Sequence, residues 1–356
     1  MILPLSLLLC AAASAAPGPK PVAGSVVRSK EWVVRRGKSK EEEFIGDVRY
    51  ESAGTKLSAD WALYRETPND WRARGHILAS KRFEDGGAVE TGGETSYYNQ
   101  TTESGSLEPA PGGRISLLRT TPLREPDHGE GDRLTWEGRR AFTLRGRAKG
   151  WGPTAEFWAD EASYGAEPAR SLALTGGRPL LHVHDDGVDG ALNAESVRGA
   201  ENPRRADAAG HVVGWLIDQS TYSRAGDPPV CVRGSREGRP GPDARVSALL
   251  APPASGARTD AALYAAEDAA FAARACPWGP RVEFWADEAR YEELPDRRLT
   301  LTGGQAALRK RDDDWSTALK ADRFVATGSP RRVLAQGKVR GWIQFKDEKK
   351  YERPVK

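Results

Sequence analysis

The chain has 356 residues, of which 38% are hydrophobic and 29% are charged, a composition typical of a globular protein with a polar surface. Lysine and arginine exceed aspartate and glutamate only by 53 to 50, and the two signs are mixed along the chain, so the charge does not indicate a nucleic-acid-binding protein. The 38 glycines and 24 prolines, without a long heptad pattern, favour many short strands and turns.

The N-terminal stretch is the first predicted element. Residues 2–16 are mostly apolar and contain Ala13-Ser14-Ala15, and a short apolar segment with a small-x-small ending is typical of a cleaved signal peptide. We therefore expect residues 1–16 to direct export. A lipid or membrane anchor is the alternative; Cys10 would carry the lipid, although Leu9 stands where a small residue is preferred. No run of about 18 apolar residues follows, so we expect no later membrane span.

A pattern of six residues recurs along the chain: an apolar residue, any residue, alanine, an acid, any residue and an apolar residue. The five copies begin at Leu57, Phe157, Leu192, Phe284 and Leu319. The copies at Phe157 and Phe284 lead to Leu-x-Leu-Thr-Gly-Gly, and the other three are followed by Ala-x-Gly-basic-apolar. Residues 151–217 also align with residues 278–344 without a gap. Such repetition predicts an architecture in which one structural unit stacks on the next.

The apolar positions alternate within each copy, and the alternation slips by one residue at the acid. Leu57 and Ala59 share one parity, whereas Ala62 and Tyr64 share the other. A period of two predicts a half-buried β-strand, and a slip inside it predicts a bulge or corner after which the inward face continues. An aspartate suits such a break because its side chain can bond to nearby backbone donors. We therefore predict an all-β protein with the acids at strand corners.

The repeats divide the rest of the chain into predicted parts. These are an N-terminal half repeat (residues 40–111), two repeats (112–217 and 245–345), a Pro/Gly-rich loop (218–244) and a charged tail (346–356). The alanine-rich residues 259–275 have some helical propensity, but they correspond to residues 132–148, which have a hairpin pattern, so we predict a hairpin. After export, Cys231 and Cys276 could form a disulfide or remain two unrelated thiols.

Other chemistry is conceivable at several residue sets. The repeated acids could form a calcium ladder or act as catalytic carboxylates; they are Asp60, Asp160, Glu195, Asp287 and Asp322. Their recurrence in every unit favours a structural role. His182 and His184 share one strand face and could bind a metal, but Arg309 and Arg311 occupy the corresponding positions one unit later. No nucleophile elbow, P-loop or paired Cys-x-x-Cys is present, so we expect no enzyme, cofactor or metal site.

Arginine pairs follow proline at equivalent positions of the two repeats, as Arg204-Arg205 and Arg331-Arg332. Further pairs are Arg139-Arg140 and Arg297-Arg298. Guanidinium groups bind phosphates well, so these residues could contact a phosphorylated ligand. The alternative is that they are solvated turn residues.

The repeated motifs carry a family likeness over most of residues 40–345. The motifs are Gly46-Asp47-Val48, Leu57-Ser58-Ala59-Asp60, Ala73-Arg74-Gly75-His76-Ile77 and Phe157-Trp158-Ala159-Asp160-Glu161-Ala162-Ser163-Tyr164, with their later copies. The chain resembles the OstA-like periplasmic proteins of lipopolysaccharide transport, the group that includes LptA and LptC. The chain departs from that pattern in its two and a half repeats, and we expect it to lack an LptC-type membrane-spanning N-terminus.

The resemblance implies an elongated, stacked β-jelly roll, open along one side, that carries the acyl chains of lipopolysaccharide or a similar amphiphile across the periplasm. Its implied partners are an inner-membrane ABC transporter, an outer-membrane translocon and further copies joined head to tail. From the strand pattern, the groove would be lined by Leu57, Ala59, Phe157, Ala159, Leu172, Leu174, Leu192, Ala194, Phe284, Ala286, Leu299, Leu301, Leu319 and Ala321.

Two alternatives to this function follow from the same sequence. A structural or assembly protein of the cell envelope would need the same alternation of apolar residues, because a filled core and an open groove have the same inward pattern. A polysaccharide-acting enzyme on a β-solenoid is the second alternative. The unequal spacing of the units argues against a regular solenoid coil.

Overall fold

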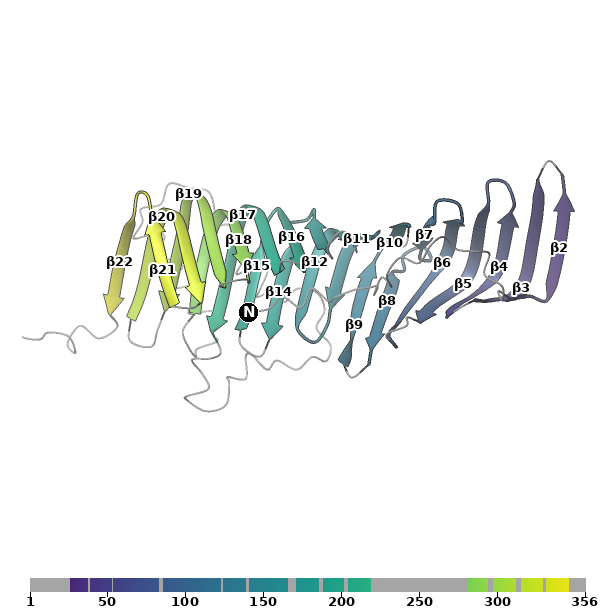
Figure 1. Ribbon diagram of the computed structural model, residues 1–356, viewed down its shortest axis with the longest axis horizontal. Helices are drawn as coiled ribbons and strands as arrows, with labels where there is room; N and C mark the ends of the chain where they lie inside the picture. Colours follow the sequence, from purple (N-terminus) through teal and green to yellow (C-terminus); the bar gives the residue numbers. More distant parts are fainter. Residues whose placement is uncertain are drawn as a thin grey trace, which may run out of the picture. The chain divides into compact units, whose positions relative to one another are not determined.

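The structure is a computed structural model (Figure 1). It describes residues 26–37, 39–52, 54–82, 86–122, 124–138, 141–165, 171–185, 188–201, 204–218, 281–293, 297–311, 315–328 and 331–345. Several predictions lie outside these residues: the signal peptide, the loop after residue 218, the hairpin at 259–275, the Cys231–Cys276 pair, Arg139-Arg140 and the charged tail.

The described residues confirm the all-β prediction. They form 22 antiparallel-paired strands, and none of them lies in a helix. In the same part of the chain, no helix has the length and apolar character needed to cross a membrane. The strands belong to two compact units, which are described separately below: an N-terminal unit up to residue 177 with residues 198–202, and a C-terminal unit of residues 178–197 and 203 onward.

Thirteen of the described strands lie wholly in the N-terminal unit. They are β1 (Val26–Arg28), β2 (Glu31–Arg36), β3 (Lys40–Ser52), β4 (Thr55–Arg65), β5 (Asp70–Arg82), β6 (Ala88–Asn99), β7 (Ser104–Glu108), β8 (Ile115–Thr121), β9 (Arg124–Gly131), β10 (Arg133–Glu137), β11 (Ala141–Trp151), β12 (Ala155–Gly165) and β13 (Ser171–Thr175). Consecutive long strands form antiparallel hairpins, as expected from the alternating pattern.

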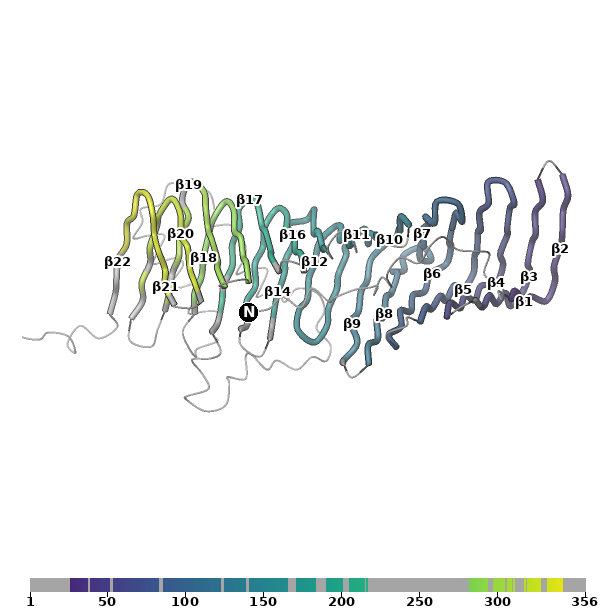
Figure 2. Tube along the Cα trace, viewed as in Figure 1, coloured from purple at the N-terminus to yellow at the C-terminus, as the bar shows by residue number. Residues whose placement is uncertain are grey.

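Each long strand changes register once, near its middle. In the β4–β5 pair the ladder is interrupted between Ser58 and Trp61, which is where the alternation slips in the sequence. The pairs β3–β4, β5–β6 and β11–β12 have the same interruption. A bulge of this kind bends the strand. In Figure 2 the traces of β3 to β5 turn sharply at the level of β1.

The bends divide the unit into two walls. The first wall consists of β2, β7, β10 and β13 with the halves 40–45, 61–65, 70–74, 95–99, 141–145 and 161–165 of the long strands. The second wall consists of β1, β8 and β9 with the remaining halves. Inward residues of both walls are buried, as Phe44 and Val48 show on either side of the β3 bend. The two walls therefore face each other across an apolar interior.

The C-terminal unit has the same construction. Its strands are β14 (Leu180–Asp185), β15 (Val188–Asn193), β17 (Arg204–Asp218), β18 (Arg281–Glu292), β19 (Arg298–Arg311), β20 (Trp315–Gly328), β21 (Arg331–Gln336) and β22 (Arg340–Phe345), and β16 (Ser196–Glu201) has residues in both units. The long strands β17 to β20 pair in sequence, and their ladders are interrupted after Ala209, Trp285 and Thr302. The predicted copy at Phe284 therefore has its bend at the acid.

Candidate functional site

Each predicted acid lies against a glycine at a bend of the sheet. Gly75 has a φ of 79°, which L side chains rarely adopt, and a Cβ added to it would lie 2.4 Å from Oδ2 of Asp60. The same close approach joins Asp160 to Gly176, Glu195 to Gly210, Asp287 to Gly303 and Asp322 to Gly337, each glycine with a positive φ. We call each acid with its glycine a corner. The glycine is required there both by its φ and by the space that the acid occupies.

The corner acids are tied to the backbone of the neighbouring strand. The carboxylate of Asp287 accepts a hydrogen bond of 2.9 Å from the Gly304 N–H, and that of Asp322 accepts one of 3.2 Å from the Lys338 N–H. The Glu195 N–H donates to the carbonyls of Ala209 and Gly210, both at 3.0 Å. These bonds satisfy backbone groups that the interrupted ladder leaves free. They support the structural interpretation of the acids over the calcium and catalytic alternatives.

A basic residue follows three of the corner glycines, and in two of these corners its side chain pairs with the acid. His76 Nδ1 lies 2.7 Å from Asp60 Oδ2, and His211 Nδ1 lies 2.9 Å from Glu195 Oε1. In these two copies the Ala-x-Gly-basic-apolar motif supplies both the glycine of the bend and the basic partner of the acid. These side chains are largely exposed, so each pair contributes little to stability.

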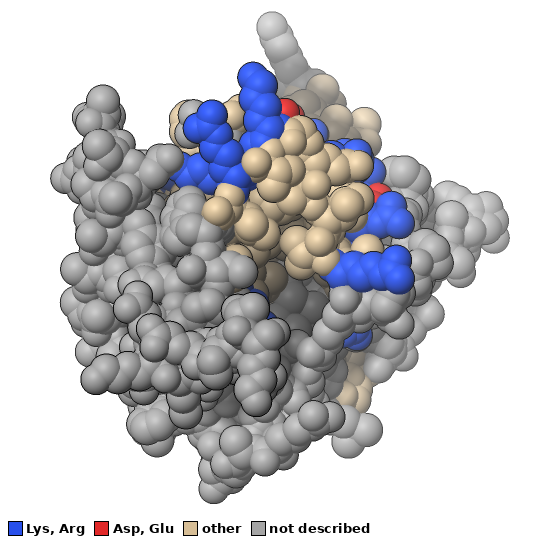
Figure 3. Space-filling model, turned by 90° about the vertical axis from the view of Figure 1, so that its left-hand side faces the viewer, with Lys and Arg blue, Asp and Glu red and all other residues tan. Residues whose placement is uncertain are grey.

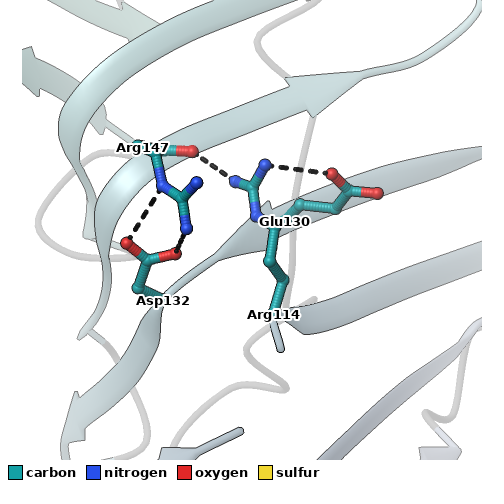
Figure 4. A network of polar contacts seen from close by, with 4 residues as sticks. All are labelled: Arg114, Glu130, Asp132 and Arg147. Atoms are coloured by element: carbon teal, nitrogen blue, oxygen red, sulfur yellow. Dashed lines mark hydrogen bonds and ion pairs between the residues drawn. The ribbon is translucent and has the colours of Figure 1, made fainter. Parts of the chain in front are cut away.

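The sequence reasoning missed one corner. Asp132 joins β9 to β10 and meets Gly146, while its carboxylate binds the guanidinium of Arg147 at 2.7 Å (Figure 4). The hydrogen bond from Arg147 holds the pKa of Asp132 below its usual value. Arg114 extends the network by binding the Arg147 carbonyl and Glu130. Asp132 lacks the preceding alanine of the repeat, and the Gly-basic pair Gly146-Arg147 was the available signal.

The corner histidine gives a pH-dependence. The hydrogen bond to Asp60 raises the pKa of His76 above 6.5, so the protonated form is favoured in the folded state. The stabilisation is complete below pH 6.5 and is lost as the pH rises through the folded pKa. We expect the unfolding midpoint of the wild type in urea to exceed that of H76Q below this window and to match it above. D60N should remove the difference, and a pH-independent difference would contradict the assignment.

Metal binding by His182 and His184 remains an open alternative. Within the described residues, no three or more histidine, cysteine or acidic side chains cluster as metal ligands. His182 lies on β14 and has an interaction partner, while the side chain of His184 is outside the described set. The pair therefore stays a possibility indicated only by the sequence.

Three of the four arginine pairs lie at strand starts. Arg205 of β17 binds Asp207 at 2.5 Å, and Arg298 begins β19. Arg332 of β21 is exposed, and nothing is described of the side chains of Arg204 and Arg331. A phosphate contact remains a prediction for these residues.

The predicted groove residues occupy the apolar interior at two levels. Ten are buried, with 8% exposure or less: Ala59, Phe157, Ala159, Leu172, Leu174, Ala194, Phe284, Ala286, Leu301 and Ala321. Four are only half-buried: Leu57, Leu192, Leu299 and Leu319. On most strands the residue next to the corner is buried, and the next inward residue is half-buried, as with Ala59 and Leu57 or Leu301 and Leu299. We call the buried level the floor and the half-buried level the mouth.

Aromatic rings fill parts of the floor. Phe157 is fully buried, and a Cβ on the paired residue Gly150 would lie 2.3 Å from Cε1 of its ring. Phe284 covers Gly214 in the same way in the C-terminal unit, also at 2.3 Å. The rings thus occupy the space over glycines on the neighbouring strand. Along β11 to β13 the floor is a packed core.

The sequence reasoning also missed an aromatic cluster in the N-terminal unit. Phe44 stacks between Trp32 and Trp71 at centroid distances of 6.2 and 5.9 Å, and Tyr64 lies 4.9 Å from Trp71. Trp32 is 61% exposed, whereas Phe44 is buried. Through this cluster, the apolar interior continues as far as the first strands of the unit. Its residues fall outside the repeated hexamers, which is why the repeat did not identify them.

No protein-family model matches the sequence, and no curated protein matches it significantly. The two-walled units, their corners and their apolar interior therefore carry the functional argument.

Proposed function

We propose that the chain is a periplasmic lipopolysaccharide-transport protein that holds acyl chains along its apolar interior and helps to bridge the inner and outer membranes. The observation that carries this proposal is the mouth level. Strand after strand, a half-buried apolar side chain lies above a closed floor: Tyr50, Leu57 and Tyr64 in the N-terminal unit, and Leu192, Leu299 and Leu319 in the C-terminal unit. An acyl chain laid along such a row would remove their remaining apolar surface from water.

The resemblance in the repeated motifs supplies the choice of cargo and partners. Lipopolysaccharide carries several acyl chains, which suits a long apolar surface rather than a single pocket. The proposed partners are an inner-membrane ABC transporter and an outer-membrane translocon. No step of chemistry is assigned to the corners, because their acids are engaged with backbone groups or basic side chains.

Photocrosslinking separates this proposal from its alternative. A photoreactive residue at Leu57 or Leu299, both in the mouth, should give lipid adducts in cells. The matched controls are Ser58 and Thr300, the adjacent residues on the opposite faces of the same strands. Adducts at the mouth positions and none at the controls are expected. Equal labelling, or no lipid adduct at either mouth position, would sink the transport proposal.

The second candidate is a structural or assembly protein of the cell envelope with a filled core. The packing along β11 to β13 favours it, since Phe157, Leu174 and Tyr164 are at most 4% exposed. This candidate expects no lipid adduct at the mouth, and it expects protein adducts at the outer faces instead.

A further inference from the structure

One inward row of the first wall of the N-terminal unit is aromatic. Aromatic residues occupy directly paired positions of β4, β5, β6, β10, β11 and β12, and only Gly105 of β7 interrupts them. Residues paired in this way lie side by side on one face of a sheet. They lie one inward step above the buried floor residues Ala62, Leu134 and Leu144. The members, which we call the aromatic row, are Tyr64, Trp71, Tyr98, Trp136, Phe142 and Tyr164.

The rings of the aromatic row are held in place but remain partly accessible. Five of the six members are half-buried, and the sixth, Tyr164, is buried. The rings of Tyr64 and Trp71 contact each other at a centroid distance of 4.9 Å. Trp136 lies over Gly105, where a Cβ would come within 2.3 Å of Cζ2 of the indole. The row therefore offers ordered apolar surface to a ligand.

The second wall carries smaller side chains at the same level. Trp71 and Ala79 each lie four residues from the bend at Gly75, on opposite walls. The ring of Tyr50 lies 6.4 Å from that of Trp71, and small residues leave more room opposite the other rings than large ones would. The N-terminal unit is thus lined by ring faces mainly on one side. The row of the second wall runs through Tyr50, Leu57, Ala79, Thr91, Leu117 and Gly129.

Amide and hydroxyl groups border the aromatic row at the ends of the β4–β5 and β6–β7 hairpins. The Tyr64 hydroxyl donates to Oδ1 of Asn69 at 3.1 Å, and Nδ2 of Asn69 donates to Oγ1 of Thr101 at 3.2 Å. Oδ1 of Asn99 accepts a bond of 2.9 Å from the Thr101 N–H. Tyrosine and tryptophan suit such a boundary, because each has an apolar ring and a polar tip.

In the C-terminal unit the same level is mainly aliphatic. Tyr291 is the aromatic member of its row and corresponds to Tyr164 of the preceding repeat. Figure 3 shows the β22 end of this unit, where uncharged side chains lie among lysine and arginine side chains. The fold therefore does not require a run of rings at this level. The row from β17 to β21 contains Ala206, Tyr291, Leu299, Ala326 and Val333.

A positively charged headgroup is one ligand class that aromatic rings attract. Such a group needs rings on several sides or an acid beside them, and the second wall contributes Tyr50 as its ring near Trp71. Glu42, the acid paired with Tyr64 in the ladder, already binds Lys40 at 2.5 Å. The arrangement therefore favours a neutral ligand with flat apolar faces and hydrogen-bonding edges.

We propose that the aromatic row binds the sugar rings of a glycolipid headgroup. A sugar presents C–H groups on its faces and hydroxyls at its edge, so it can stack on Trp71 or Trp136 while its hydroxyls meet the polar groups at the hairpin ends. The five strand spacings from β4 to β11 span about 24 Å at roughly 4.8 Å each, which accommodates several sugar rings in line. The inference rests on the proposed function, since the acyl chains of the same molecule would lie along the mouth.

Two detergents with the same alkyl chain test the headgroup preference on the full-length chain. Dodecyl maltoside carries two sugar rings, whereas dodecyl phosphocholine carries a phosphate and a quaternary ammonium group. Isothermal titration calorimetry below the micelle concentrations should show about tenfold tighter binding of the maltoside. Equal affinities, or tighter binding of the phosphocholine, would overturn the proposal.

Replacing the indoles then locates the site. W71L/W136L gives the row the aliphatic character of the C-terminal unit, so it should bind the maltoside about tenfold more weakly and the phosphocholine as before. W71F/W136F keeps ring faces and should lose less. The matched control Y291L, in the C-terminal row, should retain the preference.

An unchanged preference in W71L/W136L, with its circular dichroism spectrum intact, would refute the assignment. If that spectrum is altered, the single variants W71L and W136L decide: each should lose part of the preference, and an unchanged preference in both would refute the site.

Intact and deacylated lipopolysaccharide separate this inference from the transport proposal. If the deacylated form binds as tightly as the intact form and W71L/W136L weakens both, the sugar site stands and acyl-chain binding fails. If the intact form binds more tightly and W71L/W136L changes neither affinity, acyl-chain binding stands and the sugar site is overturned.

Discussion

Replacing Phe157 by alanine should cost about 3–5 kcal/mol of unfolding free energy, because the ring is fully buried and fills the space over Gly150. The reverse change, G150A, should cost about 1–3 kcal/mol, since its Cβ would lie 2.3 Å from the ring. The φ of Gly150 is ordinary, so backbone strain adds nothing. Urea unfolding followed by tryptophan fluorescence measures both.

The double variant G150A/F157A sharpens this result. Removing the ring removes the clash, so the combined loss should fall short of the sum by about 0.5–3 kcal/mol. The matched control is G37A, where a Cβ would meet nothing within 4 Å. Strict additivity of the two changes, or a loss in G37A equal to that in G150A, would contradict the packing described for the floor.

The second large effect is expected at Asp70, which is 1% exposed and receives two hydrogen bonds from Arg65, at 2.8 and 2.5 Å. D70A should cost about 2–4 kcal/mol, because it leaves the half-buried guanidinium without its partner. The bond to Asp70 raises the pKa of Arg65, so the guanidinium stays charged throughout the working range. Urea unfolding at neutral pH measures the loss.

Two comparisons show whether the Asp70 effect arises from the unpaired charge. R65M/D70A removes both charges and should recover part of the loss of D70A. D47A breaks the ion pair of Asp47 with Arg49, whose side chains are 53% and 65% exposed, and should change stability by no more than about 1 kcal/mol. A loss in D47A as large as that in D70A would show that burial does not decide the effect.

The sequence alone was enough to predict the β-strands and the positions of their bends, because both depend on residues that are close together in the chain. Alternating apolar residues indicate a strand wherever they occur, and the slip at Asp60 or Asp287 locates the bend within one or two residues. The corner at Asp132 escaped detection because its neighbours differ from the repeated hexamer, although its contact with Gly146 is the same. The residue types around the acid differ between the copies, whereas the contact between the acid and its glycine is retained.

The sequence alone did not predict which inward residues belong to the floor and which to the mouth. Leu172 and Leu299 occupy the same position in the two repeats, yet Leu172 is buried and Leu299 is half-buried. The difference depends on how closely the opposite wall approaches, and that is a contact between residues far apart in the chain. The stacking of Trp32 on Phe44 has the same origin, since it joins neighbouring strands outside the repeat.

The pairing of β17 with β18 has a consequence for how the chain can be cut. β17 ends at Asp218 and β18 begins at Arg281, and Ile217 pairs directly with Arg281, so residues that flank a long stretch of sequence are neighbours in the ladder. A residue added at a bend would separate an acid from its glycine. The connection between the ends of two paired strands, in contrast, can have any length. Two separately expressed fragments, divided between residues 218 and 281, could therefore reassemble through this ladder and report on folding in a complementation assay.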